Sequence, residues 1–294
     1  MKKGVLYAVL MLGVLALSTS AIFVRLADAP ASVTAFYRLF FTVLVLVPFV
    51  LSVPKERKEL LSLRGRKLAA SLLSGIFLAV HYVLWFESLS LTSVASSTVI
   101  VTLQPVFTML YAFVFLRERQ RPGAVAGCLI AIVGSAVIGF GDFRGGGTAL
   151  VGDLMALLAA AVISAYFFIG ERLRKDMSAL VYTVSAYTGS VVFLFLYTII
   201  KGDSFFGYSA GVWGCFIGIA VVSTVLGQCI FNVLLKWLSS TTIATGVLGE
   251  PVGTCILAYF ILGEVIVSRQ WIGMIIILAG LFLYFISAGR KKSG

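Results

Sequence analysis

Two stretches of the chain decide how it folds: TLQPVFTMLYAFVFLRE at residues 102–118 and GVLGEPVGTCILAYFILGE at residues 246–264. Each places a proline inside an apolar run, directly after a glutamine in the first stretch and after a glutamate in the second. A proline removes one helical hydrogen bond, and a buried amide or carboxyl group needs a partner. The recurrence of this costly arrangement far apart in one sequence points to a shared structural purpose.

A shift of 146 residues aligns the two halves of the sequence. Between residues 93–139 and 239–285, 11 of 47 positions are identical without a gap. The aligned landmarks are Gln104-Pro105 with Glu250-Pro251, Glu118 with Glu264, Gly127 with Gly273, Gly134 with Gly280, and Ser18 with Ser164. We therefore expect two repeats, residues 1–146 and 147–294.

Composition places the repeats in a membrane. Of 294 residues, 60% are hydrophobic and 12% charged, with a mean hydropathy of +1.07, which a soluble domain of this size would not bury. Apolar runs of about 18 residues or more recur from end to end, each long enough to cross a bilayer as a helix. The longest connection between them runs from Pro54 to Lys67. We predict an all-α integral membrane protein with ten transmembrane helices, at about residues 4–24, 32–53, 68–90, 93–115, 122–140, 150–170, 179–200, 211–234, 240–262 and 270–288.

Five helices per repeat is an odd number, so the second repeat enters the membrane from the opposite side. Such inverted repeats are typical of transporters, whose solute site lies in a central cavity near the midplane. Pro105 and Pro251 deprive the carbonyls of Val101 and Val247 of their usual donors. In lipid these carbonyls must face protein or a wet cavity. We predict a kink at each proline, with a gating role beside the cavity.

The net charge of +11 reflects membrane topology. With the N-terminus inside, 18 of the 23 lysines and arginines fall on the inner side and 4 on the outer side, while Arg38 lies within a span. This bias predicts a cytoplasmic-membrane protein with both termini in the cytoplasm, and anionic lipid rather than nucleic acid as the partner of its basic surface. The first 29 residues imitate a signal peptide, but we expect them to be retained because the repeat needs them.

Glu250 is the leading candidate for the solute site. A carboxylate at the bilayer centre costs several kcal/mol unless it is paired or protonated. It would bind a substrate amine or take up a proton. The alternative is a neutral acid that donates a hydrogen bond to a carbonyl freed near the kink.

The other candidates for the cavity lining are polar or aromatic residues inside predicted spans: His81, Tyr82, Trp85, Gln104, Tyr166, Gln228 and Asn232. His81 titrates near physiological pH. Trp85, one turn further along the same face, would stack a flat or cationic solute. Gln228 and Asn232 also share a face. For all of them, ordinary packing or an interhelical hydrogen bond is the alternative.

Arg38 lies roughly 10 Å inside the outer end of its span, at about 1.5 Å per residue. It would snorkel outwards, pair with an acid, or meet an anionic substrate; we favour a structural ion pair and keep it among the cavity candidates. Glu118 and Glu264 fall at helix ends, where a carboxylate satisfies the free N–H groups of the next helix. The aligned glycines permit close helix packing: Gly127, Gly134, Gly273 and Gly280.

These landmarks resemble the drug/metabolite transporter superfamily, specifically its EamA-type members. The resemblance rests on the mid-helix Pro105 with Glu118 thirteen residues later and two glycines beyond, on the second copy at Glu250-Pro251, on Ser90–Ser96, and on Arg38. It implies ten helices around a central cavity, gating by helices 3, 4, 8 and 9, and movement of small metabolites, often outwards. Gln104 departs from strict symmetry, because the second half carries an acid there.

We therefore expect a secondary transporter, an exporter, of small organic metabolites such as amino acids, amines or heterocycles. It would work by alternating access, with proton coupling as an option. A cation transporter or channel would want several midplane carboxylates, and an enzyme acting on lipid-linked substrates would want a metal site or a nucleophile with a base. With 1 histidine, 12 acids mostly at helix ends, and four cysteines lacking metal-like spacing, we expect no enzyme, cofactor or metal. The expected partners are the solute and the bilayer, in a monomer or homodimer.

Overall fold

The computed structural model of the protein describes residues 3–92, 94–139, 147–263 and 265–289, and every regular element in this part is a helix. The helices are α1 (Lys3–Ala27), α2 (Ala31–Ser52), α3 (Pro54–Ser62), α4 (Gly65–Leu91), α5 (Val94–Val101), α6 (Gln104–Leu116), α7 (Pro122–Gly139), α8 (Gly147–Leu173), α9 (Ala179–Lys201), α10 (Ala210–Gly218), the π-helix η1 (Ile219–Gln228), α11 (Cys229–Leu234), α12 (Ser240–Val247), α13 (Glu250–Leu262) and α14 (Ser268–Gly289).

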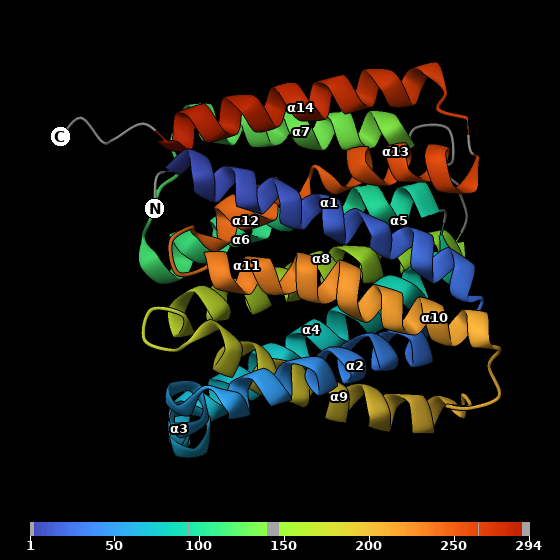
Figure 1. The fold of residues 1–294 in the computed structure, drawn as a ribbon. Coiled ribbons are helices and arrows are strands. Elements are labelled where there is room, and N and C mark those ends of the chain that lie inside the picture. The colour runs from blue at the N-terminus through green and yellow to red at the C-terminus, as the bar shows by residue number, and fades with distance from the viewer. Residues whose placement is uncertain (1–2, 93, 140–146, 264, 290–294) are drawn as a thin grey trace.

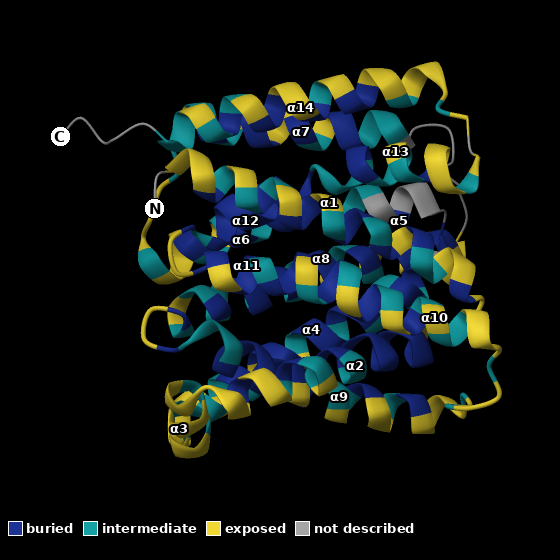
Figure 2. Cartoon of the chain, viewed as in Figure 1, coloured by how far each residue is buried: buried dark blue, intermediate teal, exposed yellow. Residues whose placement is uncertain are grey.

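Ten passes through the membrane account for these helices apart from α3. Three passes are composite: α5 with α6, α10 with η1 and α11, and α12 with α13. Among the described residues, nine spans are long and apolar enough to cross a bilayer, and α7 is a shorter apolar helix. Ile200, Phe260 and Phe282 are among the exposed apolar side chains. Exposed residues line the outward sides of outer helices such as α14 (Figure 2), as expected of a surface that faces lipid. The predicted all-α membrane fold is confirmed.

The two repeats run in opposite senses. Both termini lie on one face of the bundle, hereafter the terminal face, where Lys3 Nζ donates a hydrogen bond to the Gly289 carbonyl at 3.0 Å (Figure 1). The first helix of the first repeat, α1, starts at this face, whereas α8 starts at the opposite face (Figure 1). An odd number of passes separates the two starts, and the predicted inversion follows from it.

Two elements differ from the sequence prediction. The connection predicted between Pro54 and Lys67 contains the helix α3, which lies at the terminal face with no buried residue (Figure 1). Its proline stands at the first helical position, where it costs no hydrogen bond. The eighth pass is widened into a π-helix over η1, where Thr224 Oγ1 donates to the carbonyl of Ile219, five residues back, at 2.9 Å. Segments of this kind are frequent at functional sites.

The most extensive helix contact joins α7 to α14, one helix from each repeat. A Cβ atom placed on Gly127 would lie 2.7 Å from the Gly280 carbonyl oxygen, and one on Gly134 would lie 2.8 Å from that of Gly273. The four aligned glycines therefore form two pairs that bring the helix backbones together. Small residues at a membrane helix interface allow such an approach.

We predict that Gly280→Val destabilises the protein, because its side chain would collide with the backbone of α7, where even a Cβ lies 2.5 Å from the Ala131 nitrogen. Overpacking of this kind costs roughly 1–3 kcal/mol. The measurement is the thermal unfolding midpoint in detergent. Gly214→Val is the matched control, since Gly214 also lies in a membrane helix, and a Cβ atom added to it would have no neighbouring atom within 4 Å. Equal midpoints for both variants would contradict the packing role.

Candidate functional site

The two prolines stand where the membrane helices break. α5 ends at Val101 and α12 at Val247, and α6 and α13 restart at Gln104 and Glu250, each with the proline as its second residue. The predicted kink is therefore a two-residue interruption of the α-helix, bridged by shorter-range backbone hydrogen bonds from Leu103 to Ile100 and from Leu248 to Thr245. Proline suits the first turn of a restarting helix, since its missing N–H would have no partner there in any case. The start of each half-helix lies inside the bundle (Figure 1).

A serine from the other repeat holds each restarting helix. The Ser164 hydroxyl of α8 shares its hydrogen between the carbonyl of Gln104, at 2.9 Å, and that of Ala160 in its own helix, at 2.7 Å. The Ser18 hydroxyl of α1 does the same with the carbonyl of Glu250, at 3.1 Å, and that of Val14 in its own helix, at 2.9 Å. The serines align at the 146-residue shift, as do their acceptors, and both are fully buried. Each repeat thus supplies a donor to the broken helix of the other.

Glu250, Arg38 and Tyr82 come together beside these breaks. The guanidinium carbon of Arg38 lies 4.8 Å from the centroid of the Tyr82 ring, and its charge acts on Glu250. Glu250 lies deep in the bundle, yet its side chain keeps partial accessibility, unlike the buried Arg38 and Tyr82. The candidate site thus contains one acid and one base, contributed by different repeats.

Three candidate residues have buried polar atoms without hydrogen-bond partners among the described residues: Trp85 Nε1, Gln104 Oε1 and Gln228 Nε2. Gln104 and Gln228 are only 7% and 4% exposed. Leaving a buried donor or acceptor unpaired costs about 1–3 kcal/mol. A polar ligand or water at this position would remove that cost.

Other candidates are engaged in interhelical hydrogen bonds. His81 Nδ1 lies 3.0 Å from the Ala159 carbonyl oxygen of α8. The Tyr166 hydroxyl donates to Asn232 Oδ1 at 2.7 Å, and Asn232 Nδ2 donates to Thr183 Oγ1 at 3.1 Å. These contacts correspond to the alternative of an ordinary interhelical hydrogen bond. Tyr166 and Asn232 therefore differ from Trp85, Gln104 and Gln228, whose polar atoms have no partner among the described residues.

The ion pair that we favoured for Arg38 is not found. In the described chain no carboxylate lies within 4 Å of its guanidinium group. Its Nε donates to Thr224 Oγ1 at 3.0 Å and its Nη1 to Ser20 Oγ at 2.9 Å. The residues that hold it, Thr224 in η1 and Ser20 in α1, were missed because hydroxyls in apolar helices leave no distinctive pattern.

The two helix-end acids have different outcomes. Glu118 is exposed beyond the end of α6, and no hydrogen bond from its side chain to the start of α7 is seen among the residues described. The helix ends with Arg117 in the left-handed region at φ 56°. Because Glu118 is exposed at the end of the bundle, water can solvate its carboxylate instead. Glu264 lies outside the described residues.

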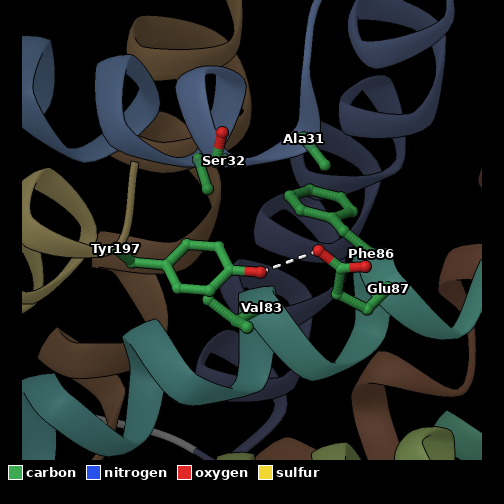
Figure 3. Close-up of a pocket in the computed structure, with 7 residues that line it drawn as sticks. Ala31, Ser32, Val83, Phe86, Glu87 and Tyr197 are labelled. Carbon is green, nitrogen blue, oxygen red and sulfur yellow. Dashed lines mark hydrogen bonds between the residues drawn. The ribbon is translucent and has the colours of Figure 1, made fainter. Parts of the chain in front are cut away.

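The face opposite the termini is closed by polar contacts. Ser32 at the start of α2 donates to Asp203 Oδ2 at 2.5 Å, and Glu87 Oε1 accepts from the Tyr197 hydroxyl and the Lys201 ammonium group, each at 2.7 Å. Figure 3 shows a pocket among these side chains, with a volume of about 10 Å³. Such a volume holds roughly one water molecule. This pocket therefore has no room for an organic solute.

The terminal face is closed by the equivalent helix. Ser178 at the start of α9 aligns with Ser32 at the 146-residue shift. Its backbone N–H donates to Glu59 Oε1 at 2.8 Å and its hydroxyl donates to Glu56, both in α3. Arg174, buried beneath, donates through Nε to the Asn232 carbonyl at 2.7 Å. Burial lowers the pKa of the Arg174 guanidinium, while Glu59 and Glu56 raise it.

These two contacts, Ser32 with Asp203 and Ser178 with Glu56 and Glu59, are hereafter the opposite latch and the terminal latch. Sequence reasoning missed both. The alignment of Ser32 with Ser178 was the one available signal, since each serine begins a helix at the same place in its repeat. No cluster of three or more His, Cys, Asp or Glu side chains suited to a metal ion occurs in the described ranges.

The family to which this architecture belongs is given by comparison with known proteins. The model of the EamA-like transporter family matches residues 2–140 and 150–286. The chain belongs to the EamA-like transporter family. An uncharacterized transporter of Clostridium kluyveri is 25% identical over 305 residues, which cover 100% of this chain and 96% of that protein.

Two further similarities agree with this assignment. The uncharacterized transporter YxxF of Bacillus subtilis is 24% identical over 233 residues, 78% of this chain and 73% of that protein. One solved crystal structure superposes with a TM-score of 0.80 at 18% identity, over 95% of this chain and 97% of that chain. At this identity the likeness shows a shared fold and no more. The resemblance read from the proline and glycine landmarks is confirmed.

We predict that Ser18→Ala and Ser164→Ala each lower the thermal unfolding midpoint, because each removes a hydrogen bond that ties a broken helix to the other repeat. The expected cost is about 1 kcal/mol for each hydrogen bond. Ser52→Ala is the matched control, since Ser52 is exposed and donates only within its own helix, to Pro48. A drop for Ser52→Ala as large as that for the other two would contradict the role assigned to the buried serines.

Proposed function

We propose that this protein is a secondary transporter that moves small organic metabolites out of the cell by alternating access. The observation that carries the proposal is the pair of broken helices, each held by a serine of the other repeat, with unpartnered polar atoms of Gln104, Gln228 and Trp85 nearby. Inverted-repeat transporters bind solutes at interrupted helices near the membrane midplane.

The site chemistry favours amino acids, amines or flat heterocycles as solutes. Glu250 offers a carboxylate to an ammonium group, and the Trp85 ring offers a stacking surface. The unpaired amide groups of Gln104 and Gln228 offer one acceptor and one donor. Phosphorylated solutes, which carry more negative charge, would call for more than the one basic residue, Arg38, at the centre.

Alternating access is supported by the two latches. They stand at opposite ends of the packed pair α2 and α9, in pseudo-symmetric positions, and both are closed. Opening one latch while the other stays closed would expose the centre to one side only. The distribution of lysine and arginine favours the terminal face as the cytoplasmic one, since α3 and the loops beside it are basic.

We infer that Glu250 is the site of proton coupling. It is an acid within a membrane helix and belongs to the first turn of α13. A group that faces the two sides of the membrane in turn can take up a proton outside after the solute leaves and release it inside before the next solute binds. Export would then quicken as the outside becomes more acidic.

We predict that Glu250→Gln removes this dependence on external pH, because the amide does not titrate. The measurement is counterflow and efflux of radiolabelled metabolites from proteoliposomes over a range of external pH. Glu118→Gln is the control, since Glu118 is exposed at a helix end, far along α6 from the break. An unchanged pH profile in Glu250→Gln would rule out the coupling role, and the absence of exchange for every solute would rule out transport.

We predict that each latch controls its own end of the molecule. In a background without the four cysteines, spin labels at Lys58 and Lys175 report the terminal face, and labels at Leu26 and Phe206 report the opposite face. Ser178→Ala with Glu56→Gln should lengthen the first distance, and Ser32→Ala with Asp203→Asn the second. Each double variant is the control for the other, and distributions identical to those of the unmodified protein would contradict the latches.

A further inference from the structure

Arg38 is a buried charge whose hydrogen-bond partners are neutral. It is 2% exposed, and its guanidinium group donates to the hydroxyls of Thr224 and Ser20. The Tyr82 ring covers one face of it at 4.8 Å. Hydroxyls and a ring orient the guanidinium plane, but they do not neutralise its charge. Buried arginines normally meet a carboxylate or another anion.

The nearest acid does not supply that anion. Glu250 is the candidate, at the start of α13. No carboxylate oxygen of the described residues comes within 4 Å of the guanidinium group, so no contact ion pair forms. A desolvated charge in this position costs several kcal/mol. Among the described residues, Arg38 therefore has no anion in contact with it.

Two neutral donors without partners belong to the helical segments that contact Arg38. Gln228, four residues after Thr224 on the same helical segment, has a buried Nε2 without a partner among the described residues. Trp85, one turn after Tyr82 on α4, has a buried Nε1 in the same condition. Amide and indole N–H groups donate only, so each requires an acceptor. Two unpaired donors on the segments that hold an uncompensated guanidinium group suit an anion with several acceptor oxygens.

We propose that Arg38 binds a single carboxylate group of the transported solute, with Gln228 and Trp85 as supporting donors. The assignment rests on the proposed transport function and narrows it, since simple amines and neutral heterocycles lack such a group. One guanidinium charge balances one carboxylate and pairs with it in a bidentate manner. With Glu250 facing an ammonium group on the same solute, the centre accepts a zwitterion without net change in charge.

The first test uses the unmodified protein and matched compounds on two skeletons. The short series is alanine, alaninamide, propionate and ethylamine; the aromatic series is phenylalanine, phenylalaninamide, 3-phenylpropionate and phenethylamine. Ligand binding to the folded state raises the unfolding midpoint, and at a fixed ligand concentration the rise is larger for the tighter ligand. In at least one series, the amino acid should bind roughly tenfold or more tightly than its amide, as expected for a charge-assisted hydrogen bond to the carboxylate. Equal affinity for acid and amide, a preference for the amide or amine, or no shift with any carboxylate would overturn the assignment.

The second test compares two buried arginines. Arg38→Gln should abolish the preference for acid over amide, and Arg38→Lys should restore part of it, since lysine keeps the charge without the planar fork. Arg174→Lys is the matched control, because Arg174 is also buried but donates to backbone carbonyls of Asn232 and Met177 at the terminal latch. Arg174→Lys should change transport rates without changing the preference for acid over amide. A preference that survives Arg38→Gln would overturn the assignment.

The two proposals fail in different ways. Selective binding of carboxylates without counterflow of any solute would refute transport and leave the Arg38 assignment standing. Counterflow of solutes with no discrimination between acid and amide would refute the Arg38 assignment and leave transport standing.

Discussion

Inside a bilayer every backbone polar group needs a partner within the protein, and this constraint governs the structure. Two helices break near the midplane and release carbonyl groups that lipid would not solvate. Ser18 and Ser164 supply donors across the repeat boundary, to the first residues of the restarting half-helices. Each donor belongs to the opposite repeat, so each broken helix is tied to the other half of the chain. The breaks therefore join the two inverted repeats inside the bundle.

The backbone obeys the pseudo-two-fold symmetry, whereas the charges do not. Glu250 stands where the first repeat has Gln104, and Arg38 stands where the second repeat has Val184. His81 aligns with a glycine, so α4 holds α8 through a ring hydrogen bond while its counterpart packs backbone to backbone. After such divergence, one repeat presents a positive group and the other a negative group to the same central space. The two repeats therefore share a backbone arrangement but carry opposite charges near the centre of the bundle.

The sequence predicted the passes, the inversion and the glycine contact, because apolar run length and a fixed repeat shift depend only on residue spacing. It did not distinguish a kink from a two-residue interruption, since a proline is compatible with both. It missed the π-helix η1 and the neutral partners of Arg38, Thr224 and Ser20, because a pattern of residues reveals burial but not which groups meet. The sequence analysis did not predict helix α3, because this polar segment contributes nothing to the apolar runs.

The contacts that hold the bundle together differ in kind from those that close its ends. Gly127 and its three counterparts let α7 and α14 pack along their length, and separating them would forfeit extensive dispersion contact. The ends are closed by hydrogen bonds to carboxylates, one from Ser32 and two from Ser178, and by the partly exposed pair of Lys201 and Glu87. A hydrogen bond to a charged group contributes about 1.5–3 kcal/mol, and an exposed ion pair about 1 kcal/mol or less. These few polar contacts are weaker than the packing along α7 and α14, so the ends would open before the centre, as the proposed alternating access requires.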